Sequence, residues 1–541
     1  MSSFNRKQQK KTLIFTIILC IAVLSAGVFV TVSHYLNRNS LFKDQGFAKA
    51  IADVLDIRPN AITQEMLDEY ESLIYFCNIG MTEDFSSSYA VPYVILGKKE
   101  YTDYSLKQAE KAAEAVEETA SDLEDEEAPD DYIMVPFIID KADDLSLFRN
   151  LRILSAFDSQ SILSMYQNTN LISAYAQYYP TISAIDFNTV MREMSITDLT
   201  SLSQLAALDK LEVLALEYTG LKKLDGLDSF PNLTGLEIAG TSIKSLEGIE
   251  KAEKLETIMM GNLGISDLSP LSSLKNLKTL DVEGNELTDL SAISGLVTLE
   301  KLSATNNKLK NLDELSELVN LEILTVVKNE IEDISGIANC VKLETLYLSE
   351  NKFEDLDTLE SLTALKTLSS NNGKISDISG VANSVKLETV DLSENEIEDI
   401  SALESCTALT SLNLSKNKVK DIEAVSKMTE LKTLTLNDNE ITDMLPVKGL
   451  NNLTNLNLAN NKITSLEGME DAFEEDITIT INLTDNEIED WEPLRGYENA
   501  TVTGMPEEDD EDDEDDTSEE ESDEDEENDE NEESDENDQE E

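Results

Sequence analysis

The chain has 541 residues, of which 40% are hydrophobic, so it can bury a large core and is not disordered as a whole. Its 111 acidic residues outnumber its 41 basic residues and give a net charge of -70, a surplus that repels the phosphates of nucleic acids. The composition therefore argues against a nucleic-acid partner.

The N-terminal segment has the pattern of a membrane anchor. Four basic residues lie within positions 1–11, and the uncharged segment Thr12–Ser33 that follows is long enough to cross a bilayer as a helix. Basic flanks favour the cytoplasmic side of a membrane. We predict a cytoplasmic basic segment at 1–11, a single transmembrane helix at 12–34, and everything after His34 outside the cell.

A cleaved signal peptide is the competing hypothesis, and it would make the protein secreted. Signal peptides have a shorter apolar region that ends at small residues, whereas Val28, Phe29 and Val30 continue the apolar segment past Ala26. We favour the retained anchor for this reason.

Residues 40–144 are predicted to form an N-terminal cap region that contains an insertion. Val91–Leu96 and Tyr132–Ile139 have the composition of strands. Tyr104–Glu127 is rich in Ala, Glu and Lys, which favours a polar helix. The segment 145–210 is predicted to hold degenerate repeats, with Leu151 and Leu154 in one copy and Leu171 in the next.

A 22-residue repeat dominates residues 211–504, of which residues 491–504 are predicted to shield the last open coil. Its frame starts at a leucine in twelve successive copies, and a thirteenth copy with three extra residues follows. In each copy an alternating LxL stretch predicts a short strand with its leucines inward, and the next apolar positions turn the chain back over them. One copy leaves half of its apolar surface in water, so the copies are predicted to stack into a solenoid with one apolar spine. The twelve starting residues are Leu211, Leu233, Leu255, Leu277, Leu299, Leu321, Leu343, Leu365, Leu387, Leu409, Leu431 and Leu453.

The pattern LxxLxLxxNxIxDIxxL is that of leucine-rich repeats, and it most resembles the internalin-like repeats of bacterial surface proteins. The resemblance implies an α/β solenoid, shaped as a horseshoe or curved rod, with short parallel strands on its concave face. The segment Phe42–Leu73 is similar to the helical cap that opens internalin-type solenoids. The resemblance also implies adhesion to, or recognition of, a protein partner.

Recurrent polar residues in this frame are predicted to be structural. An asparagine recurs at one repeat position, for example at Asn329 and Asn351, where its amide can satisfy backbone groups of the turn. Cys340 and Cys406 stand three coils apart at a position that is leucine in other copies, so they are predicted to be core residues without a disulfide. An exported protein without disulfides fits a bacterial surface.

The chain offers no candidate catalytic centre. Its single histidine, His34, lies at the predicted membrane boundary, so the exported part has no Ser-His or Cys-His pair. The sequence contains no Walker-type or GxGxxG phosphate-binding loop. We predict that the protein is not an enzyme and uses no cofactor.

One series of aspartates recurs every 22 residues and would stack about 5 Å apart. The favoured hypothesis is that each carboxylate caps backbone N-H groups of the adjoining turn. The alternative is a Ca²⁺-responsive edge, because hard cations prefer oxygen ligands, although no loop has the EF-hand spacing. The series comprises Asp333, Asp355, Asp377, Asp399, Asp421 and Asp443.

The outward positions of the predicted strands are mostly small and polar. The apolar exceptions are Ile323 and Val327 on one coil, Tyr347 on the next coil, and Met259 farther away. Exposed apolar residues beside an aromatic ring can anchor a protein partner, but strand propensity alone would also favour such residues here. Both hypotheses stay open, and these four residues are the candidate ligand-binding residues.

The segment 505–541 is predicted to be a disordered acidic tail. Its last 35 residues contain 27 acidic and no basic residues, so it has nothing to bury and repels itself. Such a tail can attract cations or basic proteins.

These features together predict a membrane-anchored, surface-exposed leucine-rich repeat protein of a bacterium that binds another protein through its concave face. One alternative is an acidic leucine-rich repeat chaperone for basic proteins, which the tail favours and the membrane segment opposes. The other alternative is a structural protein of the cell envelope whose tail binds cations.

Overall fold

The structure is a computed structural model, and it describes residues 41–42, 45–81, 88–114, 132–135, 147–155, 199–217, 219–474 and 477–506. The predicted transmembrane helix at 12–34 and all but the first two residues of the predicted tail lie outside these ranges. Among the helices within them, none is long and apolar enough to cross a bilayer. Every helix and strand described below lies within residues 1–504.

Each repeat contributes one short strand to a continuous parallel sheet. Leu302 in β9 (Lys301–Ser303), Leu324 in β10 (Ile323–Thr325) and Leu346 in β11 (Thr345–Tyr347) stand opposite one another, so neighbouring strands pair 22 residues apart. These middle leucines are buried, because successive side chains of a strand point to opposite faces. The inward direction of the LxL leucines is confirmed. The other strands of the array are β4 (Ile153–Ser155), β5 (Val213–Glu217), β6 (Gly235–Ala239), β7 (Thr257–Met259), β8 (Thr279–Asp281), β12 (Thr367–Ser369), β13 (Thr389–Asp391), β14 (Ser411–Asn413), β15 (Thr433–Thr435), β16 (Asn455–Asn457), β17 (Ile479–Asn482) and β18 (Ala500–Thr503).

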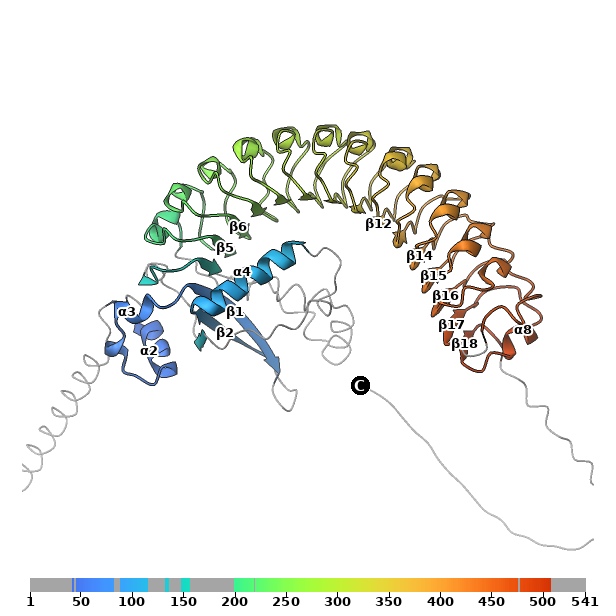
Figure 1. The fold of residues 1–541 in the computed structure, drawn as a ribbon, viewed down its shortest axis with the longest axis horizontal. Helices are drawn as coiled ribbons and strands as arrows, with labels where there is room; N and C mark the ends of the chain where they lie inside the picture. Colours follow the sequence, from blue (N-terminus) through green and yellow to red (C-terminus); the bar gives the residue numbers. More distant parts are fainter. Residues whose placement is uncertain are drawn as a thin grey trace, which may run out of the picture. The chain divides into compact units, whose positions relative to one another are not determined.

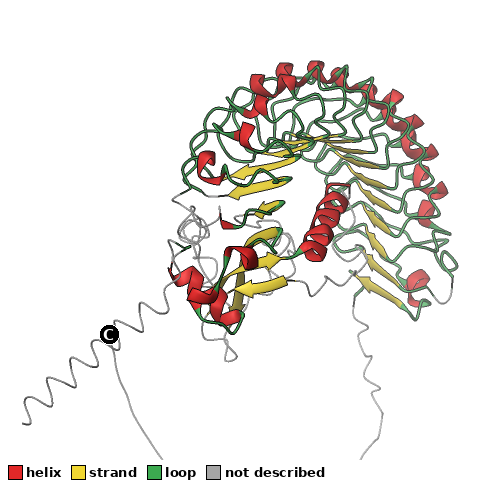
Figure 2. Cartoon of the chain, turned by 60° about the vertical axis from the view of Figure 1, so that its left-hand side comes forward, coloured by secondary structure: helices red, strands yellow, loops and turns green. Residues whose placement is uncertain are grey.

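Short 3-10 helices lie on the other side of the coils. Figures 1 and 2 show the strands along the inner side of the curved array and the helices along its outer side. Besides the leucines of the strands, the repeats have apolar residues in their 3-10 helices that are buried in the same interior, such as Ile337 in η10 (Ser335–Ile337). The remaining 3-10 helices of the described ranges are η1 (Pro59–Ala61), η4 (Leu202–Leu205), η5 (Leu227–Ser229), η6 (Ile249–Lys251), η7 (Ser269–Ser273), η8 (Ser291–Ile293), η9 (Asp313–Leu315), η11 (Asp357–Ser361), η12 (Ser379–Asn383), η13 (Ser401–Ser405), η14 (Glu423–Lys427) and η15 (Leu445–Val447).

The apolar spine is formed by side chains that different coils contribute to the same interior. Leu324, Leu346 and Leu368 have no exposed surface. Removing one leucine side chain from water contributes roughly 2 kcal/mol. Because each leucine is covered by the coils before and after it, this contribution depends on stacking and is not available to one coil alone.

In most coils of the regular array, a residue with left-handed backbone and the asparagine after it shape the turn that follows the strand. Lys328 has a φ of 56°, which is unfavourable for a residue other than glycine. The next residue, Asn329, accepts the N-H of Leu309 on its side-chain Oδ1 at 3.0 Å. Its Nδ2 donates to the carbonyls of Ala304 and Val326, both at 3.0 Å. These hydrogen bonds confirm that the recurrent asparagine satisfies backbone groups of the turn.

Strands β1 (Ser72–Met81), β2 (Ser88–Gly97) and β3 (Tyr132–Val135) extend the sheet before the repeats. β1 pairs parallel with β4 and antiparallel with β2, and β2 pairs antiparallel with β3. Among the described strands, β3 pairs only with β2 and β18 pairs only with β17. The sheet of 18 described strands is therefore open, with β3 and β18 at its two ends. The strands predicted at 91–96 and 132–139 are confirmed, the second within its described part.

Helices α2 (Gln45–Val54) and α3 (Gln64–Leu67) precede β1 in the segment that resembles an internalin cap. Phe47 and Leu67 are buried, and the ring of Phe47 lies 6.2 Å from the ring of Phe148. α4 (Lys99–Glu114) begins before the predicted start of the polar helix at Tyr104, and residues 115–127 of that prediction lie outside the described ranges. The cap as a functional unit stays a prediction.

Arg152 joins the N-terminal strands to the first regular repeat. Its Nε donates to the carboxylate of Glu212 at 2.7 Å, and its guanidinium also donates to Asp103 of α4 at 2.5 Å. These carboxylates, with Glu212 first, raise the pKa of the guanidinium above its ordinary value. The contacts hold α4, β4 and the turn before β5 together.

Of the segment 145–210, which is predicted to hold degenerate repeats, the structure describes residues 147–155 and 199–210, and these contain β4 and η4. The repeats themselves stay a prediction. Leu151 and Leu154 have no exposed surface, and Leu154 of β4 stands opposite Leu214 of β5. Leu171 lies outside the described residues.

α8 (Glu492–Arg495) and β18 cover part of the C-terminal end of the array. The side chains of Trp491, Leu494 and Tyr497 are buried against the last repeats. The hydroxyl of Tyr497 donates to the carbonyl of Met469 and accepts the N-H of Ala472, both at 2.6 Å. The shield predicted at 491–504 therefore consists of a short helix and one added strand.

Candidate protein-binding face

Three of the four candidate residues lie together on the outward side of β10 and β11. Ile323 is in β10, Val327 follows this strand, and Tyr347 in β11 is paired with Thr325 of β10. The N-H of Val326 donates to the carbonyl of Tyr347 at 2.9 Å, which keeps the two coils in register. Ile323, Val327 and Tyr347 are each half-buried, and we call these three residues the apolar patch.

Met259 does not belong to this patch. It is in β7, and β8 and β9 stand between it and β10. Its neighbours across the sheet are Glu237 and Asp281, which are both acidic. Met259 thus lies in a different, charged setting.

A hydrogen-bonded polar surface borders the apolar patch on its C-terminal side. The hydroxyls of Ser349 and Ser369 are 3.0 Å apart, and the Nδ2 of Asn371 donates to the carboxylate of Asp391 at 3.0 Å. Asp391 also accepts the N-H and the hydroxyl of Ser393. Because these groups satisfy one another, they form an ordered polar rim beside the patch.

Two carboxyl groups with raised pKa lie on the N-terminal side of the patch. Asp281 of β8 accepts the N-H of Glu283 at 2.9 Å. Burial raises the pKa of Asp281 above its ordinary value. Burial, together with the negative charge of Asp281, also raises the pKa of Glu283. The patch is therefore flanked by two carboxyl groups with raised pKa on one side and by a hydrogen-bonded polar surface on the other.

The recurrent aspartates cap the turns that lead into the 3-10 helices. Asp333 accepts the N-H of Ser335 at 2.8 Å, and this backbone hydrogen bond is the main cause that lowers the pKa of its carboxyl group. The other members of the series accept the N-H of the residue two positions on in the same way. They are Asp355 at 3.2 Å and Asp377, Asp399, Asp421 and Asp443 at 2.8 Å.

Capping by itself accounts for the placement of these six carboxylates. In the part of the chain that the structure describes, no three His, Cys, Asp or Glu side chains form a group that could hold a metal ion. The Ca²⁺-responsive edge stays a hypothesis, tested below.

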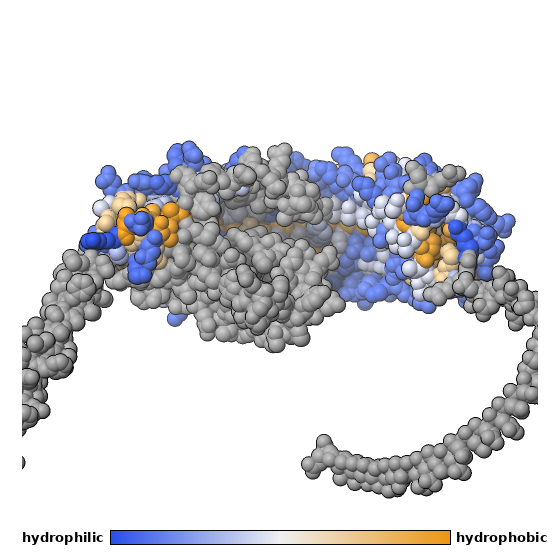
Figure 3. All heavy atoms as spheres, turned by 90° about the horizontal axis from the view of Figure 1, so that it is seen from below, coloured by the Kyte–Doolittle hydropathy of each residue, from blue (hydrophilic) through white to orange (hydrophobic). Residues whose placement is uncertain are grey.

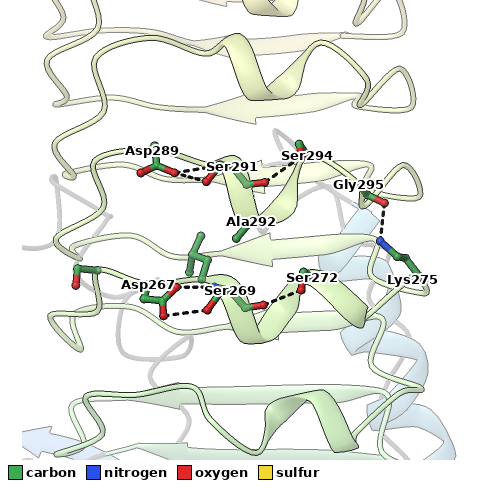
Figure 4. A pocket seen from close by; sticks show the side chains of 11 residues that line it. Asp267, Ser269, Ser272, Lys275, Asp289, Ser291, Ala292, Ser294 and Gly295 are labelled. Atoms are coloured by element: carbon green, nitrogen blue, oxygen red, sulfur yellow. Dashed lines mark hydrogen bonds between the residues drawn. The ribbon is translucent and has the colours of Figure 1, made fainter.

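A groove of about 510 Å³ lies between η7 and η8 on the outer side of the coils. Figure 4 shows Asp267 and Asp289 turned toward the serines of their own turns, and Lys275 turned toward Gly295 of the next coil. Asp267 accepts the N-H and the hydroxyl of Ser269 at 2.8 and 2.9 Å. Lys275 donates to the carbonyl of Gly295 at 3.0 Å. Because these groups already have partners, the groove is explained by the packing of two coils.

The eighth coil, residues 365–386, contains a polar interruption that was not predicted from the sequence. Ser370 and Ser384 replace apolar residues of the spine and are 2% and 0% exposed, and Gly373 replaces the recurrent asparagine. The hydroxyl of Ser384 has no hydrogen-bond partner among the described residues. Alignment of the copies shows these three exceptions, so the signal was present in the sequence.

An apolar column outside the strands was also missed. Val297, Val319 and Val341 occupy one repeat position on three successive coils and are 50%, 45% and 52% exposed. The position lies two residues before the first leucine of the next copy and therefore outside the strands. The column is a second exposed apolar feature, separate from the apolar patch.

Comparison with known proteins agrees with this geometry. A family model described as Leucine Rich repeats (2 copies) matches residues 253–295, 341–383, 385–427 and 429–471. A search of curated protein sequences finds no match. Among solved structures, an internalin from Listeria monocytogenes is 29% identical, with a TM-score of 0.52, over 59% of this chain and 93% of that chain.

Two further solved structures are more distant in sequence. A leucine-rich repeat protein of Leptospira interrogans is 19% identical over 57% of this chain and 93% of its own, with a TM-score of 0.45. The ectodomain of a receptor kinase from Arabidopsis thaliana, solved in complex with CASPARIAN STRIP INTEGRITY FACTOR 2, is 16% identical over 67% of this chain and 48% of its own, with a TM-score of 0.47.

The stacked coils, the parallel sheet and the asparagine turns define the array as an open leucine-rich repeat solenoid. The four matched segments are leucine-rich repeats. The array is similar to that of the internalin from Listeria monocytogenes.

Proposed function

We propose that the protein is displayed on the outer surface of a bacterial cell, held there by residues 12–34, and binds another protein through the concave face of its sheet. The observation that carries this proposal is the apolar patch. Ile323, Val327 and Tyr347 bring two aliphatic side chains and an aromatic ring together on a face that is otherwise small and polar. An apolar centre within a polar rim is the usual arrangement of a protein interface.

The two flanks of the patch would set its specificity. A partner that covers Tyr347 meets the hydrogen-bonded polar rim of Ser369 and Asn371 on one side and the carboxyl groups of Asp281 and Glu283 on the other. Polar groups at the rim of an interface select the partner and its orientation, whereas buried aromatic residues supply most of the affinity. Loss of the tyrosine ring should weaken binding by about thirtyfold or more, which corresponds to roughly 2 kcal/mol.

The test uses the full-length chain as the target of a displayed random-peptide library. Peptides selected on the unchanged protein are then measured against the variant Tyr347→Ala with Val327→Ser. The matched control is Thr435→Ala with Asn437→Ser, because Thr435 occupies the same repeat position as Tyr347 four coils farther on. The proposal expects most selected peptides to lose binding to the first variant and to keep it for the second. Equal binding to both variants would show that the apolar patch is not the binding site.

Anchoring is tested on cells of the source organism. A retained helix keeps the protein in the membrane fraction after alkaline extraction, and protease added outside intact cells removes the repeats. Release of the intact repeats into the medium would support the cleaved signal peptide instead.

A second candidate function rests on the acidic composition of the tail. A basic protein held by 27 acidic residues should dissociate as salt is raised, because charges in water are screened within about 10 Å at 0.1 M salt. Binding to the apolar patch should persist under the same conditions. Capture of basic proteins that disappears in salt and does not depend on Tyr347 would favour the chaperone or cation-binding alternatives.

A further inference from the structure

The last strand of the array has a partner on one side only among the described residues. β18 pairs parallel with β17, with Val502 opposite Ile481 and Thr503 opposite Asn482. Figure 1 shows β18 at the end of the sheet that lies farthest from β1 and β2. The strand is therefore an edge to which a further strand could be added.

The direction of the backbone groups identifies which residue faces this open edge. Thr503 faces β17, since its carbonyl accepts the N-H of Leu483 at 3.0 Å. Alternate residues of a paired strand direct their N-H and C=O groups to opposite sides. The N-H and C=O of Val502 consequently point away from β17, where an added strand would bond to them.

The apolar spine is also incompletely covered at this end. Ile481 of β17 and Leu456 of β16 have no exposed surface, whereas Val502, the next residue in the same register, is half-buried. Figure 3 shows hydrophobic atoms facing outward at the C-terminal end of the array, on the right, with hydrophilic atoms around them. A strand added to β18 would bury this surface as well as satisfy the backbone groups.

The charge around the edge selects what could be added. The described residues from 477 onward carry six carboxylates and a single cation, Arg495, which lies beside Glu492. The carboxylates are all exposed, at Asp485, Glu487, Glu489, Asp490, Glu492 and Glu498. A second copy of this edge would bring an equal negative charge against the first, and like charges close together disfavour association.

We propose that β18 is a docking edge for an extended peptide segment that carries lysine or arginine, and that this segment adds to the sheet as a further strand. Backbone hydrogen bonds to Val502 supply the alignment, as in other cases of strand addition. The exposed carboxylates supply attraction to the basic side chains. This site is separate from the apolar patch, so the variant Tyr347→Ala should leave it unchanged.

The test measures binding of a fluorescent eight-residue peptide that alternates valine with threonine and lysine, using the full-length protein in detergent. A second peptide has the same sequence with alternate backbone nitrogens methylated, so it keeps its charge but cannot pair as a strand. The proposal expects the methylated peptide to bind at least about tenfold more weakly. Because only the probe changes, this comparison does not depend on the folding of a variant.

Two variants of Val502 test the same point from the side of the protein. Val502→Pro removes the outward N-H, and proline is tolerated on the free side of an edge strand. Val502→Ala shortens the side chain but keeps the N-H. Val502→Pro should weaken binding by about tenfold, and Val502→Ala by less than about threefold.

Four results would overturn the proposal. Equal binding of the two peptides, or of Val502→Pro and the unchanged protein, would show that charge alone attracts the peptide. Failure of the unmodified peptide to bind would show that the surrounding carboxylates only keep the edge from pairing. A dimer that becomes monomeric in Val502→Pro, with no peptide binding, would assign the edge to a second copy of the chain.

Discussion

Replacing Asn417 by alanine removes one member of the buried asparagine series. This variant tests whether the side-chain amide hydrogen bonds stabilise the turns. The Oδ1 of Asn417 accepts the N-H of Ile397 at 3.0 Å, and its Nδ2 donates to the carbonyls of Leu392 and Leu414 at 2.9 and 3.1 Å. Asn417 is only 8% exposed, so water does not readily replace these hydrogen bonds.

The cost of Asn417→Ala can be estimated from what each partner loses. The two carbonyls keep one partner each, because Leu392 also accepts from Asn395 and Leu414 also accepts from Asn439. The N-H of Ile397 loses its partner in the turn. One unsatisfied buried group costs about 1–3 kcal/mol, so we expect a loss of roughly 2 kcal/mol in the free energy of unfolding, with a little more from the lost packing.

Urea unfolding followed by circular dichroism measures this loss, and hydrogen exchange locates it. The matched control is Asn452→Ala, because Asn452 is exposed and donates a single hydrogen bond to the carbonyl of Thr429 at 2.8 Å. The control should change the free energy of unfolding by less than about 0.5 kcal/mol. If Asn417→Ala costs no more than the control, the buried amides do not stabilise the turns and the reasoning fails.

Three further predictions concern the polar residues of the array. Ser384→Cys places at this position the residue that Cys340 and Cys406 provide in other coils and removes the unpartnered hydroxyl, so it should raise the free energy of unfolding by about 1 kcal/mol in urea titrations; a destabilised variant would mean that the hydroxyl has a partner in solution. Asp281→Asn should raise the melting temperature at pH 7, because burial raises the pKa of Asp281 in the folded state and its stability contribution is lost as pH rises through that value. This gain should vanish below the ordinary pKa of 3.8, and a gain that is the same at pH 3 and pH 7 would contradict it. Calcium should leave the melting temperature unchanged if the Asp333 series only caps turns, whereas a rise that is lost in Asp333→Asn would support the Ca²⁺-responsive edge.

The repeat frame made most of the array predictable from the sequence. A spacing of 22 residues fixes which leucines align, so the pairing of Leu302, Leu324 and Leu346 follows from the pattern alone. The same counting places Tyr347 one coil after Ile323 and Met259 three coils before it. The composition of the candidate patch could therefore be worked out from periodicity.

Other parts of the fold were not predictable because no repeated pattern defines them. β18 contains no leucine and was expected only to shield the last coil, yet it extends the sheet. The direct pairing of β4 with β5 joins strands that are far apart in the sequence. The pKa shifts of Asp281 and Glu283 depend on how much neighbouring atoms cover each carboxyl group, which the sequence does not state.

A photoreactive side chain on the concave face tests the central claim most directly. Benzoylphenylalanine is introduced in place of Tyr347 in one variant and in place of Thr435 in another, in the full-length chain on cells of the source organism. Irradiation should link the first variant to a partner protein and leave the second largely unlinked. Equal linking at both positions, or linking at 435 alone, would contradict recognition through the apolar patch.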